Sequence, residues 1–178
     1  MKRAVFLDRD GVLIRAIVRD GKPYPPRDLE ELEILSGVAE SLDRLHRSGF
    51  LVIVVTNQPD VVRGIQTREM VEKINAAIDT KLLIDEFVVC YHDSADHCFC
   101  RKPNPGSLLR SAEKFGLNLN DCFMVGDRDS DIKAGISAGC KTILIDYHYL
   151  ETKNAKPDYC ASGLIEAVDW ILEGKRTK

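Results

Sequence analysis

The sequence has no apolar run of the roughly 18–20 residues that a membrane-spanning helix needs. The apolar stretch at residues 4–7 is followed at once by charged residues, so it is too short to form the core of a secretory signal peptide. We therefore expect a cytoplasmic protein.

An excess of basic charge is also absent. The chain carries 25 Lys and Arg against 28 Asp and Glu, for a formal net charge of −3, which provides no field to attract nucleic acid or an anionic membrane. Internal repeats, low-complexity tracts and linkers are absent too. A chain of 178 residues can bury a substantial core by itself. We expect a single domain over residues 1–178 that is monomeric and acts on a small molecule.

Five short apolar runs alternate with amphipathic helical patterns along the chain. Runs that are apolar throughout are typical of strands buried on both faces, and their alternation with helices indicates a parallel sheet. The sequence therefore predicts an α/β fold, with a doubly wound, Rossmann-like and mainly parallel sheet covered by helices on both faces. The predicted strands are Ala4–Leu7, Phe50–Val55, Phe87–Cys90, Cys122–Val125 and Thr142–Ile145.

Helix boundary signals support the same reading. Thr67 can cap a helix that runs to about Leu82. Asn104 followed by Pro105 is typical of a helix start, and Gly116 is placed to end that helix. Further helical patterns begin near residues 38 and 164.

Polar residues follow the predicted strands directly or precede a helix. The carboxyl ends of parallel strands share one edge of a sheet, where doubly wound folds bind their ligands. We therefore expect these residues to form one site. They are Asp8, Asp10 and Gly11 after the first strand, Thr56 and Asn57 at the end of the second, Arg101 and Lys102 before the Asn104 helix, and Gly126 to Asp131 after the fourth.

This set of side chains fits one reaction. Carboxylate oxygens are the ligands that Mg²⁺ prefers, and Mg²⁺ commonly binds substrate phosphate as well. A lysine offsets charge on phosphoryl oxygens. A carboxylate such as Asp8 can act as a covalent nucleophile, and a second one two residues later can move a proton to the leaving group. The sequence predicts Mg²⁺-dependent phosphoryl chemistry through an aspartyl-phosphate.

A second metal site is indicated by Cys90, His92, Cys98 and Cys100. Three thiolates and one imidazole form a standard closed tetrahedral set for zinc. A closed set leaves no position for substrate, so this zinc would be structural and would brace the loop of about residues 90–100 before Lys102. Two alternatives stay open: His97 could replace His92, or the thiols could be reduced and unliganded.

Four segments together resemble the motifs of the haloacid dehalogenase (HAD) superfamily. The resemblance implies that Asp8 is the nucleophile and Asp10 the general acid and base. It also implies that Thr56 and Lys102 hold the phosphoryl group, and that Asp127 completes a Mg²⁺ site with Asp8 and the backbone carbonyl of Asp10. Asp131 is expected to support this site from behind its ligands. The four segments are residues 6–11, residues 55–57, Lys102 and residues 125–131.

Within this superfamily the chain is similar to the heptose bisphosphate phosphatases and the histidinol-phosphate phosphatases, whose branch carries such a zinc loop. The Arg63-Gly64 pair resembles the heptose enzymes, which act as D-glycero-D-manno-heptose 1,7-bisphosphate 7-phosphatases in the supply of activated heptose for surface glycans. The short zinc loop resembles the histidinol enzymes, and Pro59-Asp60 departs from the heptose pattern. We favour the heptose bisphosphate, with histidinol phosphate or another small sugar phosphate as the alternative.

The gaps between the motifs are filled by predicted elements, which leaves no room for a cap domain. Specificity would then depend on residues 14–27, residues 57–64 and the zinc loop. An alternative from another class is a receiver-like signalling domain that is phosphorylated on Asp8, although such a domain has no need of Asp10. The candidate substrate-binding residues are Arg9, Asn57, Gln58, Arg63, Arg101 and Arg128.

Overall fold

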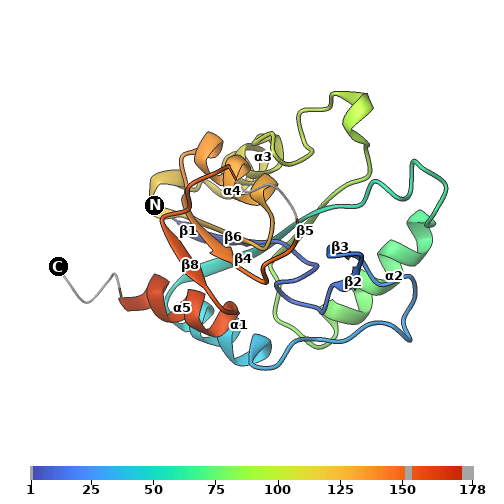
Figure 1. Ribbon diagram of the computed structural model, residues 1–178. Coiled ribbons are helices and arrows are strands. Elements are labelled where there is room, and N and C mark those ends of the chain that lie inside the picture. The colour runs from blue at the N-terminus through green and yellow to red at the C-terminus, as the bar shows by residue number, and fades with distance from the viewer. Residues whose placement is uncertain (1, 151–153, 174–178) are drawn as a thin grey trace.

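The computed structural model describes residues 2–150 and 154–173. Within these ranges six strands pair in parallel in the order β5-β4-β1-β6-β7-β8 (Figure 1). The chain thus moves outward in one direction from β1 and then returns to build the other half, which is the strand order of a doubly wound sheet. The predicted fold class is confirmed. The strands are β1 (Arg3–Leu7), β4 (Phe50–Asn57), β5 (Glu86–Cys90), β6 (Phe123–Gly126), β7 (Lys141–Ile145) and β8 (Tyr159–Ala161).

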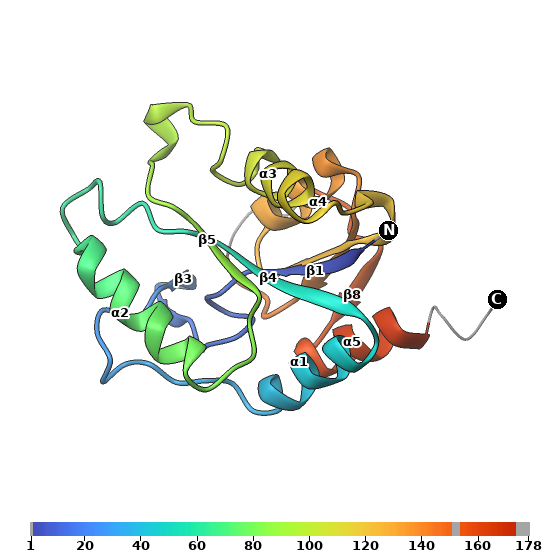
Figure 2. The ribbon, with the colours of Figure 1, turned by 180° about the vertical axis from the view of Figure 1, so that it is seen from behind.

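Helices cover both faces of this sheet (Figure 2). On one face lie α1 (Val38–Arg47), α2 (Arg68–Asp79) and α5 (Leu164–Glu173), whose apolar sides share a core cluster. On the other face lie α3 (Gly106–Phe115) and α4 (Asp129–Ala138), which pack in a second cluster.

Alternation along β1 shows how the sequence produces this sandwich. Val5 and Leu7 belong to the cluster under α1, α2 and α5, whereas Ala4 and Phe6 belong to the cluster under α3 and α4. Side chains of successive strand residues point to opposite faces, so a strand that is apolar throughout is buried on both. All four are 0% exposed, and burial of one large apolar side chain contributes roughly 1.5–3 kcal/mol.

The five predicted strands are present, each within two residues of its expected ends, and Thr67 caps α2 by accepting a hydrogen bond from Met70 N at 3.1 Å. Two helix boundaries differ. Helix α2 ends at Asp79 rather than near Leu82. Helix α3 begins at Gly106 with Pro105 at its N-cap position and no side-chain cap, and Asn104 Nδ2 donates to Cys98 O at 2.8 Å.

A β-hairpin was not predicted in the irregular stretch between β1 and α1. It consists of β2 (Ile17–Arg19) and β3 (Lys22–Tyr24), joined by Asp20 and Gly21 with φ of 50° and 72°. Two central residues at positive φ are the backbone of the tight hairpin turn that Asp-Gly favours. Apart from this hairpin, no folded insertion separates β1 from α1 in the described chain. Across the described ranges, no helix has the length and apolarity required to traverse a bilayer.

Candidate active site

The predicted site residues gather at the carboxyl edge of the sheet. Asp8 follows β1, Asn57 ends β4 and Asp127 follows β6. Strands β1 and β6 are neighbours, and they mark the point where the order of the strands reverses. Ligands of doubly wound sheets bind in the crevice outside the strand ends at such a point.

Three buried carboxylates form the centre of the site. Ligand atoms of Asp8, Asp127 and Asp131 all lie within 4.8 Å of one another. Among the described residues neither oxygen of Asp127 has a hydrogen-bond partner. Burial, and next the charge of Asp8, raise the pKa of Asp127 well above its usual range. Three buried carboxylates that repel one another, one of them with no hydrogen-bond partner among the described residues, fit a divalent cation, whose charge would satisfy them.

Gly11 makes room for this cluster. A Cβ on Gly11 would lie 2.0 Å from Asp127 Oδ2, and the residue has a φ of 83° that disfavours side chains. Two constraints therefore require glycine at position 11: the positive φ of the turn, and the lack of space for a Cβ beside the Asp127 carboxylate.

Lys102 joins two of the carboxylates. Its Nζ lies 2.8 Å from Asp8 Oδ1 and 2.7 Å from Asp131 Oδ1, and it donates to Val55 O at 2.7 Å. Burial alone would lower the pKa of Lys102, but the charges of Asp131 and Asp8 outweigh burial and raise it. The lysine is therefore a fixed cation beside the candidate nucleophile.

Asp131 belongs to this centre more directly than the sequence indicated. Its side chain is 1% exposed and contributes to the three-carboxylate group. Burial raises its pKa to about 6, against the lowering effect of Lys102. Because its oxygens also pair with Lys102 and with Arg128 N at 3.0 Å, Asp131 both orders the lysine and lies in reach of a cation.

Asp10 is held from a different side. Arg9 donates to both of its oxygens, from Nε and Nη2 at 3.2 Å each, and Gln58 Nε2 donates to Oδ2 at 2.9 Å. Burial raises the pKa of Asp10, and the charge of Arg9 opposes that rise. The carboxyl group lines the same cavity as Asp8, which is the position that a proton donor to the leaving group requires.

Two candidate substrate-binding residues are placed elsewhere, and the prediction for them is corrected. Arg9 is 0% exposed and Gln58 is 2% exposed, and neither lines the cavity. Their side chains turn inward. Arg9 donates to Asp10, and Gln58 Nε2 donates to Asp10 Oδ2 at 2.9 Å and to Thr56 Oγ1 at 2.8 Å.

The cavity over the carboxylates has a volume of about 290 Å³, and a second cavity of about 250 Å³, called the outer cavity below, shares part of its lining. Both are lined by Asn57, Arg101 and Arg128, and Arg63 lines the outer one. Strand β3 and the residue after it add Pro23, Tyr24 and Pro25 to the lining of both cavities. Tyr24 lies within residues 14–27, to which the sequence assigned specificity; the hairpin that carries it was not predicted, although the Asp20-Gly21 turn signal could have revealed it.

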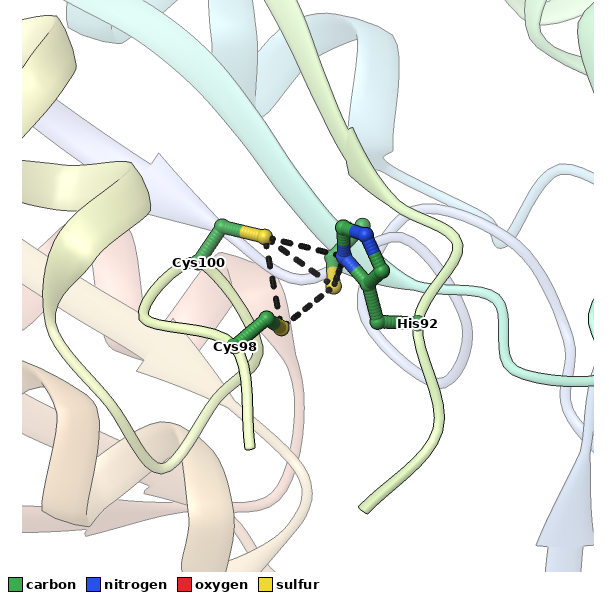
Figure 3. Close-up of side chains that lie close together, drawn as sticks. His92, Cys98 and Cys100 are labelled. Atoms are coloured by element: carbon green, nitrogen blue, oxygen red, sulfur yellow. Dashed lines mark hydrogen bonds between the residues drawn. The ribbon is translucent and has the colours of Figure 1, made fainter. Parts of the chain in front are cut away.

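The predicted zinc ligands converge. His92, Cys98 and Cys100 point toward one another (Figure 3), and Cys90 joins them in a single four-residue group. Cys100 Sγ lies 3.4 Å from Cys90 Sγ, 3.5 Å from Cys98 Sγ and 3.4 Å from His92 Nδ1. Zn–S bonds of about 2.3 Å place the ligands of a tetrahedral site roughly 3.8 Å apart. The group therefore has the dimensions of a zinc site, with His92 rather than His97 as its imidazole.

The loop that holds the Cys/His group is anchored to the segments on either side of Lys102. Ser107 Oγ donates to Cys100 O at 2.9 Å, and Arg101 Nη1 donates to His92 O at 3.2 Å. On its outer side Asp93 accepts two hydrogen bonds from Arg63, at 2.6 and 2.7 Å. The loop thus connects the residues before Lys102 with the segment after β4.

Comparison with known proteins agrees with this geometry. A family model described as HAD-hydrolase-like matches residues 99–167. A D-glycero-beta-D-manno-heptose-1,7-bisphosphate 7-phosphatase of Helicobacter pylori J99 is 31% identical over 176 residues, which cover 95% of this chain and 97% of the relative. The protein of the same name from Escherichia coli K12 is 29% identical, and the match covers 95% of this chain and 87% of that relative.

A solved structure shares the whole fold. The D,D-heptose 1,7-bisphosphate phosphatase of B. bronchiseptica, complexed with magnesium and phosphate, superposes with a TM-score of 0.81 at 26% identity. The match covers 98% of this chain and 99% of that one.

Proposed function

The chain belongs to the HAD-like phosphatase family that includes the heptose bisphosphate phosphatases, and we propose that it removes the 7-phosphate of D-glycero-D-manno-heptose 1,7-bisphosphate through an aspartyl-phosphate on Asp8. The observation that carries this proposal is the position of Lys102, which lies between Asp8 and Asp131 beside the unpaired carboxylate of Asp127. A nucleophile, a fixed cation and a cation-binding group thereby share one buried centre.

Asp8, Asp127 and Asp131 are the side chains that would hold Mg²⁺, together with the backbone carbonyl of Asp10. When bound, Mg²⁺ supplies charge that neutralises the phosphoryl oxygens and the carboxylates around them. Lys102 offsets charge on the same phosphoryl group and fixes the orientation of Asp8. Thr56 is 1% exposed and does not line the cavity, and its Oγ1 accepts from Gln58; its assignment to the phosphoryl group rests on the motif alone.

Asp10 moves the proton in both halves of the reaction. In the first, the carboxylate of Asp8 attacks phosphorus while Asp10 protonates the departing sugar oxygen. In the second, Asp10 takes a proton from the water that attacks phospho-Asp8, which releases phosphate and restores both carboxyl groups. A pKa raised by burial favours the protonated form that the first step needs.

The second phosphate of the substrate would bind in the outer cavity. Arg101 and Arg128 line both cavities, so cationic side chains lie beyond the reacting centre; Arg63 also lines the outer cavity, but its guanidinium group is paired with Asp93 and Asp60. The planar guanidinium group binds phosphate through two parallel hydrogen bonds. This second cluster of positive charge favours a bisphosphate over histidinol phosphate, which carries a single phosphate group.

We propose that Cys90, His92, Cys98 and Cys100 bind a structural zinc ion. Its ligands would hold the loop before Lys102 and would take no part in the chemistry.

The experiment that tests this function is phosphate release, with Mg²⁺, from heptose 1,7-bisphosphate and histidinol phosphate side by side. Asp8→Asn serves as the control for contaminating phosphatase. A preference for the heptose that disappears in Asp8→Asn supports the proposal, and a preference for histidinol phosphate would retain the mechanism and overturn the substrate. Persistence of phospho-Asp8 without turnover would instead favour the receiver-like alternative.

A further inference from the structure

Arg9 carries a fully buried positive charge, and the proposed chemistry does not use its guanidinium group directly. It is 0% exposed, and it uses Nε and Nη2 on Asp10. Its remaining arm, Nη1, donates to Asn75 Oδ1 at 2.8 Å. A buried guanidinium is tolerated only when its donors are satisfied, since each unsatisfied buried donor costs about 1–3 kcal/mol.

Asn75 stands out on its own helix. It lies on the inward face of α2 with Val71, Ile74 and Ile78, which are apolar, and it is itself 8% exposed. Asn has a low helix propensity and burial of its amide is unfavourable. The hydrogen bond to Arg9, 66 residues away in sequence, gives this polar residue a reason to occupy an apolar face.

We propose that Asn75 is a positioning residue for the proton transfer, acting through Arg9 to fix the carboxyl group of Asp10. The inference rests on the proposed function of Asp10 as the general acid. A guanidinium is a rigid planar fork, so anchoring Nη1 on Asn75 sets the plane in which Nε and Nη2 meet the two oxygens of Asp10. Gln58 restrains the same carboxyl group from another side, since its Nε2 donates both to Asp10 Oδ2 and to Thr56 Oγ1. Helix α2 thereby contributes to catalysis without contacting the substrate.

Dependence on the leaving group separates this role from a merely structural one. A misplaced general acid slows the departure of a poor leaving group much more than that of a good one, because a good one departs without a proton. The test measures kcat/KM, which reports phosphoryl transfer to Asp8, for phenyl phosphate and p-nitrophenyl phosphate. The variants are Asn75→Ala, Asn75→Asp, which keeps the acceptor oxygen, and Asp10→Asn as the reference for a lost acid. Ile78→Val is the control for weakened packing of α2.

We expect Asn75→Ala to lower kcat/KM about tenfold for phenyl phosphate, since small misplacement of a catalytic group is costly, and about twofold or less for p-nitrophenyl phosphate. Asn75→Asp should restore most of the loss, and Ile78→Val should change both substrates equally. Should Asn75→Ala fold poorly, Arg9→Lys gives the same test, since an ammonium cannot bridge Asp10 and Asn75 as the fork does.

Equal losses for the two esters in Asn75→Ala, beside a leaving-group dependence in Asp10→Asn, would overturn the inference and leave the proposed function intact. Absence of that dependence in Asp10→Asn itself would refute the acid role of Asp10, and the inference with it.

Discussion

The side chain of Asn57 and the backbone of Lys102 are joined by two hydrogen bonds. Asn57 Nδ2 donates to Lys102 O at 2.9 Å, and Lys102 N donates to Asn57 Oδ1 at 3.1 Å. The paired bonds connect the end of β4 to the segment after the zinc loop. They fix the position of the Lys102 backbone, and from that position the ammonium group reaches Asp8.

Asn57→Ala tests this relationship. Loss of both hydrogen bonds frees the Lys102 backbone, and misplacement of a charge-stabilising group is expected to lower kcat about tenfold or more. Steady-state kinetics with a phosphomonoester measure the effect, and Asn154→Ala, in a late loop outside the two cavities, is the control. An unchanged kcat in Asn57→Ala would show that the lysine is held by other contacts.

Asp127→Asn should separate stability from activity. The substitution removes one of three buried, mutually repelling carboxylates, so the metal-free protein is expected to melt about 2–4 °C higher, which corresponds to about 1 kcal/mol for a chain of this size. Turnover should fall at least about 100-fold because the cation site is broken. Thermal melts with and without Mg²⁺ test the account: wild type should be stabilised by Mg²⁺ and the variant should not.

Removal of zinc should act on stability first. Cys98→Ser, or treatment with a strong chelator, takes away the group that closes the loop at residues 90–100. We expect the melting temperature to fall by roughly 5–10 °C, since metal binding contributes directly to folding, with a smaller effect on the chemical step. Cys160→Ser, an exposed cysteine outside the cluster, is the matched control. Unchanged melting after verified metal removal would contradict a structural zinc.

Arg101→Ala and Arg128→Ala should discriminate between substrates. Both side chains line the outer cavity, so each variant is expected to raise KM for the heptose bisphosphate about tenfold, which is the loss of roughly one charge-assisted contact. The KM for p-nitrophenyl phosphate, which has no second phosphate, should change little. Arg110→Ala on the exposed side of α3 is the control, and equal effects on both substrates would remove the assignment of a second phosphate site.

The strands and the edge-of-sheet cluster could be predicted because both depend on short-range signals. Phe50 to Val55 is apolar throughout, and a run of this kind has few alternatives to a strand buried on both faces. Asp8 and Asp127 each follow such a run directly, so the parallel topology alone brings them to the same edge. The convergence of Cys90, His92, Cys98 and Cys100 was predictable from residue type and spacing.

The inward-turned residues could not be predicted, because their partners lie far away in sequence. Nothing local distinguishes Arg9, which is buried, from Arg128, which lines the cavity. The difference comes from Asn75, whose acceptor oxygen arrives through the packing of α2.

The most direct test of the central claim is to trap the intermediate on the nucleophile. Asp10→Asn protein would be mixed with Mg²⁺ and p-nitrophenyl phosphate, whose leaving group departs without a proton, then quenched in acid within the first turnovers, treated with borohydride and analysed by peptide mass spectrometry. Borohydride reduces an acyl phosphate to the alcohol, so the account predicts homoserine at position 8, and none when Asp8→Asn is combined with Asp10→Asn. Phosphate release without reduction at residue 8, or with reduction at another carboxylate, would contradict the assignment of Asp8 as the nucleophile.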